Sequence, residues 1–308
     1  MDHILTYFNI GGRAGRTDRG TSSSPPLLDP VPAELRKNIS IPAWKNWVQP
    51  SRDLFWSDLR QFFPEGYQQT YGLLSTRIHP IPAPVREAIF DVFAPKSLRS
   101  NKMKFLARSE NKDCLIRIYL GRRQDRSDLA LFKLRNFDLM VNEMEQLGLD
   151  TAFFAKVLAE ALAVLHWKAK VDADDVEFVL GRAPVTNMPP TAANLEVWGR
   201  DSPAGREFLE FDCQQRRMGV WLLDFNQCKE FPESETGIKQ LQNSFYYNDP
   251  YYPRPISDHP YDVMLWNTFK GAYLQTSGRL TKTDWPEKFV DAVEHEGKRR
   301  ASLNSMFD

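Results

Sequence analysis

The residues best able to do chemistry are acidic side chains in two short segments, KVDADDVEFVLG and WLLDFNQC. They are Asp172, Asp174, Asp175 and Glu177 in the first segment and Asp224 in the second. Carboxylates grouped in one cleft can bind Mg²⁺, take a proton from a substrate, or hold a cationic group. Because an unpartnered buried carboxylate is costly, Asp172 and Asp224, which have apolar neighbours, are expected to have a ligand or a partner. Asp174 and Asp175 fit equally well in a solvated turn.

The elements that must position these acids are predicted from hydrophobic spacing. Asp150 is a favourable N-cap for a helix that runs to about Trp167, with an apolar face at helical spacing. His166, near the end of that helix, could act as a base or could satisfy core carbonyl groups. A short strand follows the four acids, and a second buried strand ends at Asp224. Two such strands joined by a long loop would place the acids of both segments in one cleft.

Residues 96–126 carry the strongest charge asymmetry of the chain. Ten Lys and Arg residues face three acids there, which gives a local net charge of +7. Such a segment is either a solvated basic face or a contact surface for the phosphates of a nucleic acid. Within it, Ile116, Ile118 and Leu120 alternate with polar residues, which predicts a strand, and residues 131–137 are predicted to form its neighbour.

Two aromatic segments have both a structural and a functional interpretation. The Trp- and Phe-rich residues 42–63 favour a hydrophobic core over a docking arm. The segment NDPYYPRP holds Tyr251 and Tyr252 between prolines, so these rings could stack on a ligand or form a structural corner. Residues 1–30 are expected to be a flexible segment, because Gly, Ser, Pro and Arg dominate residues 11–27.

Composition limits the class of protein. The 308 residues include 40 Lys+Arg and 40 Asp+Glu, which argues against a surface that binds nucleic acid all over. Hydrophobic residues are 42% of the chain, which is typical of a packed core. There is no apolar run of about 18 residues for a membrane span and no secretory leader pattern. Three cysteines without a C-x-x-C pair favour a reducing compartment, so we expect a cytoplasmic protein without a membrane partner.

The order of these elements resembles the C-lobe of protein kinases. Asp172 stands where the catalytic-loop Asp would be, and Glu177, five positions later, stands where the metal-binding Asn would be. Asp224, Phe225 and Asn226 take the place of the Asp-Phe-Gly motif. The resemblance implies an α/β (α+β) fold with a mainly helical, kinase-like C-lobe over residues 138–308. A glycine-rich phosphate loop and its lysine are not found, which implies a shortened or rebuilt N-lobe over residues 31–137 and no productive ATP site.

A second resemblance covers roughly residues 60–300. Six ordered strings, among them NKDCLIRIYLGRR, ALAVLHWKAKVDADDVEFVLG, WLLDFNQC and NDPYYPRP, are similar to a fungal domain of unknown function that is often described as a zinc-finger protein. The spacing of the three cysteines does not fit a zinc site. Characterised members of that family include arginine-containing cyclodipeptide synthases. The resemblance implies an ATP-independent aminoacyltransferase without a cofactor, which joins arginyl-tRNA and a second aminoacyl-tRNA into a diketopiperazine.

This activity would require carboxylates for an arginyl side chain, a base for an α-amine, and a basic surface for tRNA. The expected catalytic residues are Asp172, Glu177, Asp224 and His166. The expected substrate-binding residues are Asp174, Asp175, Asn226, Tyr251 and Tyr252. The expected tRNA-binding residues are Lys102, Lys104, Arg117, Arg122 and Arg123. No metal ligands are expected, and the alternatives are a small-molecule kinase-like phosphotransferase and an inactive kinase-like interaction scaffold.

Overall fold

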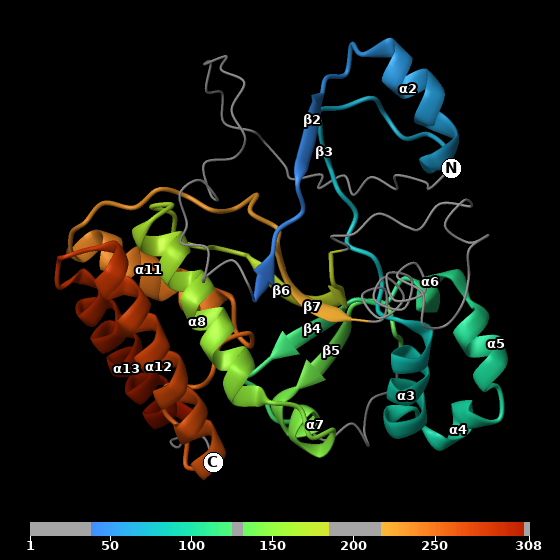
Figure 1. The fold of residues 1–308 in the computed structure, drawn as a ribbon. Helices are drawn as coiled ribbons and strands as arrows, with labels where there is room; N and C mark the ends of the chain where they lie inside the picture. Colours follow the sequence, from blue (N-terminus) through green and yellow to red (C-terminus); the bar gives the residue numbers. More distant parts are fainter. Residues whose placement is uncertain (1–37, 125–131, 185–216, 305–308) are drawn as a thin grey trace, which may run out of the picture.

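The computed structural model describes residues 38–124, 132–184 and 217–304 as a mixed α/β structure (Figure 1). A five-stranded sheet has the strand order β1-β7-β6-β4-β5. Its strands are β1 (Ile39–Ser40), β4 (Ile116–Tyr119), β5 (Phe137–Met140), β6 (Glu177–Arg182) and β7 (Met218–Leu223). The mixed α/β class is therefore confirmed, while the kinase-like arrangement remains a prediction.

The sheet combines both pairing directions. Strand β6 is antiparallel to β7 and to β4, whereas β5 is parallel to β4 and β1 is parallel to β7. The predicted strands around Ile116 and before Asp224 are confirmed. The predicted partner strand at 131–137 is wrong in its position, because β5 begins only at Phe137. Asn136 just before it has φ +49°, a left-handed conformation that interrupts extended backbone.

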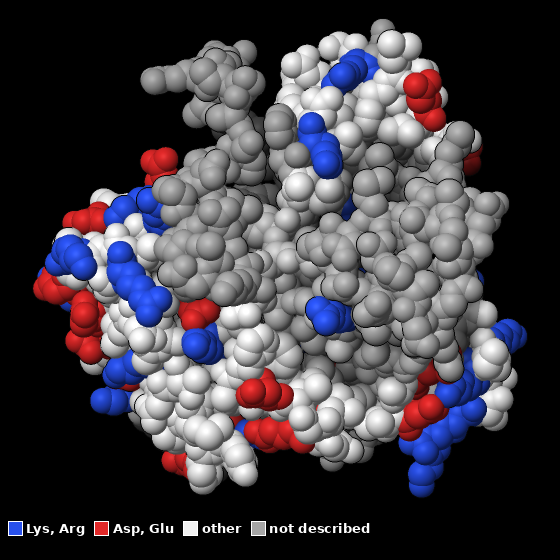
Figure 2. Space-filling model, in the orientation of Figure 1, with Lys and Arg blue, Asp and Glu red and all other residues white. Residues whose placement is uncertain are grey.

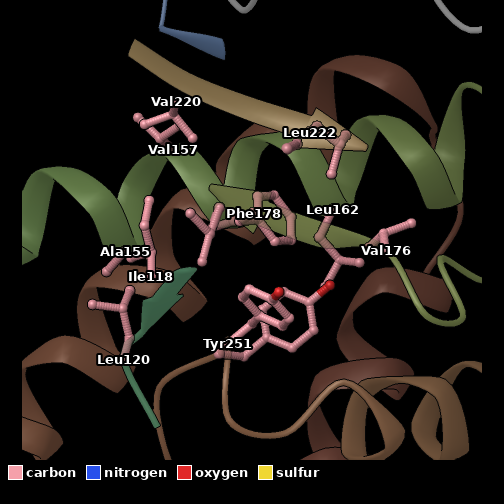
Figure 3. Packing of buried hydrophobic residues seen from close by; sticks show 14 of the residues in the cluster. Ile118, Leu120, Ala155, Val157, Leu162, Val176, Phe178, Val220, Leu222 and Tyr251 are labelled. Carbon is pink, nitrogen blue, oxygen red and sulfur yellow. The ribbon is translucent and has the colours of Figure 1, made fainter. Parts of the chain in front are cut away.

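Helices cover one face of this sheet (Figure 1). The long ones are α8 (Thr151–Trp167), α11 (Glu235–Tyr247), α12 (Pro260–Leu280) and α13 (Trp285–Asn304). The side chain of Asp150 accepts a hydrogen bond from the Phe153 N–H at 2.9 Å, which confirms the predicted N-cap of α8. Figure 3 shows the packing between α8 and the sheet, with Val157 and Leu162 beside Phe178 and Leu222.

Alternation along the strands separates this core from the opposite face. In β4 the residues Ile116 and Ile118 are buried in the helical core, whereas Arg117 and Tyr119 lie on the other face. The opposite face, called the polar face here, carries charged side chains such as Arg117 and Glu177 beside a small apolar cluster of Ile78, Leu115, Val179 and Trp221. It is the face on which the acids of the sequence analysis must be sought.

Short helices follow the N-terminal part of the chain. They are α3 (Ala83–Phe93), α4 (Lys96–Arg99), α5 (Lys102–Ala107), α6 (Ser109–Lys112) and, after β5, α7 (Val141–Gln146). The first half of the basic segment thus lies on helices, Arg117 lies on β4, and Arg122 and Arg123 follow that strand. The predicted boundary between residues 137 and 138 falls inside β5, so the two predicted lobes share one sheet.

A small unit precedes these helices. It consists of β2 (Trp44–Val48), α2 (Asp53–Leu59), the 3₁₀ turn η1 (Arg60–Phe62) and β3 (Gly72–Ser75), with β2 antiparallel to β3. Trp56 is buried there against Phe63 and Tyr67, as the tryptophan-rich segment predicts. Trp47, in contrast, is 45% exposed. The predicted flexible segment 1–30 lies outside the described residues, and no helix within the described ranges could span a bilayer.

Candidate functional site

Two carboxylates meet where strands β6 and β7 lie side by side. Glu177 is the first residue of β6 and pairs with Leu223, the last residue of β7. Asp224 follows at once with φ +66°, so the chain turns sharply after the strand. Burial raises the pKa of Glu177, and the nearby charges of Asp224 and Asp175 raise it further against the opposing effect of Arg117. The predicted proximity of Glu177 and Asp224 therefore holds.

Asp172 lies deeper than the other acids and bonds only to the protein's own groups. It is 2% exposed. Its Oδ1 accepts the N–H groups of Lys229 at 2.9 Å and Asp174 at 3.2 Å, and its Oδ2 accepts from Gln240 Nε2 at 2.7 Å. Asp172 was predicted as a catalytic acid, but its carboxylate fixes the loop between α8 and β6 against α11. The sequence could not show this, since its partners come from later in the chain.

Asp174 and Asp175 are half-buried in that same loop. The Asp175 N–H donates to Asn248 Oδ1 at 2.8 Å, and its Oδ2 accepts from Gln227 Nε2 at 2.6 Å. Burial raises the pKa of Asp174, Asp172 and Asp175 add to the rise, and Lys229 opposes it. Burial and the neighbouring negative charges both disfavour the ionised form of Asp174, so a cationic ligand beside it would be stabilised.

Cys228 lies within the field of the same acids. Burial raises the pKa of its thiol to about 12, and Asp172, Asp174 and Asp224 contribute to the rise. The Sγ atom lies 3.7 Å from the Asp174 carbonyl oxygen, to which the thiol donates. A thiol with such a pKa is protonated at neutral pH, so Cys228 is a packing residue and not an activated nucleophile.

Arg117 belongs to this site and not to an outer basic surface. It projects from β4 on the polar face of the sheet and forms an ion pair with Glu177. In the same register it pairs with Asp138 of β5, and Tyr119 follows two positions later on the same face. Arg117 was predicted to bind tRNA. Its guanidinium has a carboxylate of the chain as a partner, and its role toward tRNA stays a prediction. Tyr119 and Asp138 were missed, although the alternation along β4 marks the polar face.

Tyr251 and Tyr252 lie against this end of the sheet. The Tyr251 and Pro250 carbonyl oxygens accept the N–H groups of Leu120 at 3.2 Å and Gly121 at 2.9 Å. Gly121 is required there, since a Cβ would lie 2.3 Å from the Tyr252 carbonyl oxygen.

Both tyrosine rings are buried. Tyr252 is buried and stacks on Phe245 at 4.8 Å between ring centroids, so it has no face for a base. Tyr251 is 7% exposed and meets Tyr119 edge-on at 5.0 Å. Of the two interpretations of this segment, the buried rings fit the structural corner, and a ligand contact stays a prediction; the charges near the Tyr251 hydroxyl include Glu177.

His166 is a core residue. It is 1% exposed, and its Nδ1 lies 2.9 Å from the hydroxyl of Tyr273, which also accepts from Trp167 Nε1 at 2.8 Å. Burial lowers the pKa of His166 to about 3, against the effect of the Asp172 backbone, so its ring is neutral. The predicted catalytic base is thus enclosed by aromatic rings, because the helix position that ends α8 faces inward. Asn226, a predicted substrate contact, is exposed beyond Asp224.

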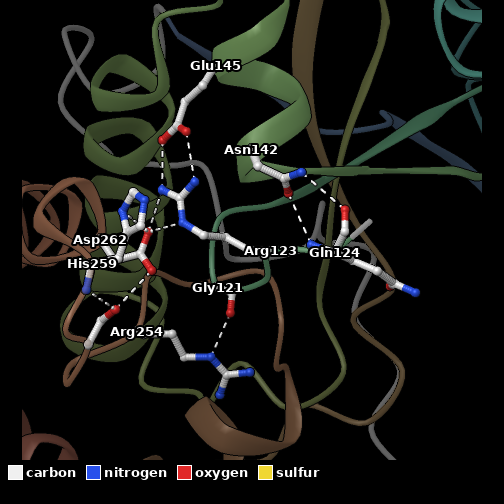
Figure 4. A network of polar contacts seen from close by, with 9 residues as sticks. Gly121, Arg123, Gln124, Asn142, Glu145, Arg254, His259 and Asp262 are labelled. Carbon is white, nitrogen blue, oxygen red and sulfur yellow. Dashed lines mark hydrogen bonds and ion pairs between the residues drawn. The ribbon is translucent and has the colours of Figure 1, made fainter. Parts of the chain in front are cut away.

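The predicted tRNA-binding residues differ in whether they form ion pairs within the protein. The Arg123 guanidinium donates to both carboxylate oxygens of Glu145 at 2.8 Å and forms an ion pair with Asp262 at 2.6 Å (Figure 4). Lys102 pairs with Asp91 at 2.7 Å. Figure 2 shows Lys and Arg side chains over α4 and α5 with acidic side chains beside them. The local charge of the segment is therefore partly neutralised, whereas Lys104 and Arg122 are exposed.

Comparisons with known proteins give one partial match. A family model for a domain of unknown function, described as "Zinc finger protein", matches residues 220–284, which include β7, Asp224 and α11. Neither the curated proteins nor the solved structures contain a match. The matched residues hold one cysteine and one histidine, Cys228 and His259, fewer than a tetrahedral zinc site needs. Within the described parts of the chain, no group of three or more His, Cys, Asp or Glu could hold a metal ion.

Proposed function

We propose that this chain is an arginine-containing cyclodipeptide synthase, which joins arginyl-tRNA and a second aminoacyl-tRNA into a diketopiperazine. The observation that carries the proposal is the carboxylate edge, formed by Glu177 and Asp224 at adjacent strand ends with Asp174 and Asp175 beside them. Crowded carboxylates, of which Glu177 and Asp174 have raised pKa values, favour a guanidinium or an ammonium group as a ligand. The family resemblance of six sequence strings supports the same activity.

The reaction is two aminolyses of esters. The α-amine of one aminoacyl group attacks the ester carbonyl of the other, so that a C–N bond forms and the C–O bond to the ribose of the tRNA breaks. The proton lost by the amine passes to a carboxylate and from there to the released ribose oxygen. A second aminolysis within the dipeptidyl ester closes the ring and releases the second tRNA. The energy comes from the two esters, so ATP is not needed.

The environments of the acids suit them to different roles in this reaction. Glu177 is suited to take the proton, because burial raises its pKa toward neutrality and its conjugate acid can release the proton again. Asp224, Asp174 and Asp175 would hold the arginyl guanidinium of the substrate. The ion pair between the Arg117 guanidinium and Glu177 is the same kind of contact within the protein. Lys104 and Arg122 are the exposed members of the predicted tRNA-binding set and would contact tRNA phosphates.

The test is product formation from purified aminoacyl-tRNAs, followed by mass spectrometry. Asp224→Asn keeps the size of the side chain but removes one negative charge. Removing one partner of a charge pair in a half-buried site costs about 2 kcal/mol, so arginine-containing product should fall about 30-fold. Asp91→Asn, whose carboxylate pairs with Lys102 away from the acids, is the matched control and should keep full yield. Product that needs ATP and survives RNase treatment would contradict the proposal.

A phosphotransferase is the second candidate, favoured by one observation. An acid that directly follows a buried strand in a left-handed conformation, next to a second acid on the paired strand, is an arrangement that can hold Mg·ATP. ATP hydrolysis that Asp224→Asn abolishes would establish it. The inactive interaction scaffold predicts no turnover in either assay. The cytoplasmic location stays a prediction.

A further inference from the structure

Two buried hydrogen-bond donors of the site have no acceptor. They are the hydroxyl of Tyr251 and the Nε–H of Arg117. Tyr251 is 7% exposed, and the Arg117 guanidinium uses another nitrogen for Glu177. Native structures seldom leave buried donors unpaired, because each loses its hydrogen bonds to water on folding. Two such donors in one site therefore indicate a ligand with an acceptor oxygen.

Both donors have the same neighbours, because Arg117 and Tyr251 interact electrostatically with each other and each of them with Glu177 and Tyr119. Tyr251 meets Tyr119 edge-on at 5.0 Å, and Tyr119 stands two residues after Arg117 on the same face of β4. Glu177, which Arg117 binds, lies at the start of the neighbouring strand β6. The Tyr251 carbonyl oxygen accepts the Leu120 N–H at 3.2 Å, which holds its backbone at the end of β4, and its ring packs against Tyr119 and Phe178.

The surroundings of these donors select the chemistry of the ligand. A guanidinium and a phenol attract an oxygen that carries negative charge, whereas Glu177 and the neighbouring Asp224 attract a cation. A ligand that satisfies both sides has a carbonyl oxygen and an ammonium group separated by two carbon atoms. An α-aminoacyl group is such a ligand.

We propose that Tyr251 and Arg117 bind the acyl oxygen of an α-aminoacyl group whose ammonium faces Glu177. This inference rests on the proposed function and deepens it, because it assigns the part of the substrate that every aminoacyl ester shares. As the attacking amine adds to the carbonyl carbon, this oxygen gains negative charge, and the two donors stabilise it there.

The experiment is isothermal titration of the full chain with two probes, L-arginine amide and L-norleucine amide. Both carry the ammonium and the carbonyl oxygen, and only the first carries a guanidinium. Tyr251→Phe keeps the buried ring and removes the hydroxyl, so the dissociation constants for both amides should rise about tenfold. Tyr252→Phe, which keeps the ring stacked on Phe245, should leave both unchanged.

Each outcome decides one of the two proposals. Unchanged binding in Tyr251→Phe, or no binding of either amide by the wild-type chain at millimolar concentration, overturns the acyl-oxygen site, and product formation then judges the proposed function alone. A tenfold loss together with equal affinity for the two amides supports the acyl-oxygen site and overturns the selectivity for arginine. Where Tyr251→Phe does not fold, Arg117→Lys keeps a cation for Glu177 but lacks the Nε–H donor, and the same loss is expected.

Discussion

Replacing Asp172 by Asn tests whether this acid holds the loop or contacts a substrate. The Asp172 carboxylate accepts from two backbone N–H groups, those of Lys229 and Asp174, and from the side-chain amide of Gln240. Asparagine has one acceptor oxygen and one amide group. If the oxygen of asparagine takes the place of Oδ1, its NH₂ faces Gln240 Nε2, which also donates to the Glu230 carbonyl oxygen at 3.2 Å, so one hydrogen bond is lost and the other two lose their charged acceptor.

The magnitude follows from these contacts. A hydrogen bond to a charged group contributes about 1.5–3 kcal/mol, so the lost bond costs about that much, and the two bonds that remain lose the contribution of the charge. We expect Asp172→Asn to lower the free energy of unfolding by about 3 kcal/mol. At about 2–4 °C per kcal/mol, the melting temperature should fall by about 6–12 °C. Activity below that temperature should persist, because the carboxylate does not face the ligand.

The assay is thermal unfolding followed by circular dichroism, together with product yield at a temperature where both chains are folded. Asp175→Asn is the matched control, since its carboxylate accepts only from the exposed side chain of Gln227. Its melting temperature should change by no more than about 2 °C. A variant Asp172→Asn that melts with the wild type but has lost all activity would refute this reasoning and restore the catalytic role.

The remaining predictions concern proton uptake and close packing. Because burial raises the pKa of Asp174, the folded chain holds this proton more tightly than the unfolded chain, so the stability of the wild type falls as pH rises through that raised pKa. The melting temperature of Asp174→Asn, relative to that of the wild type, should therefore increase between about pH 4 and 7. A flat or falling difference would contradict this prediction. Gly237→Ala should destabilise the chain by about 1–3 kcal/mol, since the added Cβ would lie 1.7 Å from the Pro232 carbonyl oxygen. The Cβ added by Gly271→Ala in α12 meets no atom within 4 Å, so this variant should be more stable than the wild type by about 0.5–1 kcal/mol. Chemical denaturation measures both glycine variants, and equal effects of the two would show that the close contact at residue 237 does not matter.

Local signals predicted most of the elements around the site. The Asp150 cap, the apolar face of α8, and the alternation of β4 depend on residues a few positions apart, so the sequence reveals them. The position of Asp224 at the end of an apolar run was enough to place it at the end of β7. The candidate site was therefore predictable where a strand end fixes a side chain.

The partners of charged residues were not predictable in the same way. Arg123 bonds to Asp262, 139 positions later, and Arg117 bonds to Glu177, 60 positions later. A window of sequence counts such residues as free positive charge, which is why the basic segment looked stronger than the folded surface is. The sequence left the interior place of His166 and its catalytic use as alternatives for a related reason, since only the packing of α12 against α8 brings Tyr273 to it.

The parallel pairing of β1 with β7 has a consequence for synthesis of the chain. Ile39 and Ser40 find their partners Val220 and Trp221 only after more than half of the chain has been made. Until then the nascent chain exposes the edges of β1 and β6. The sheet closes late, because the entropy of closing so long a loop is lost before the distant strand contacts stabilise the sheet. Truncation before residue 218 would thus leave β6 as an open edge, and chaperone binding during translation would be strongest before β7 leaves the ribosome.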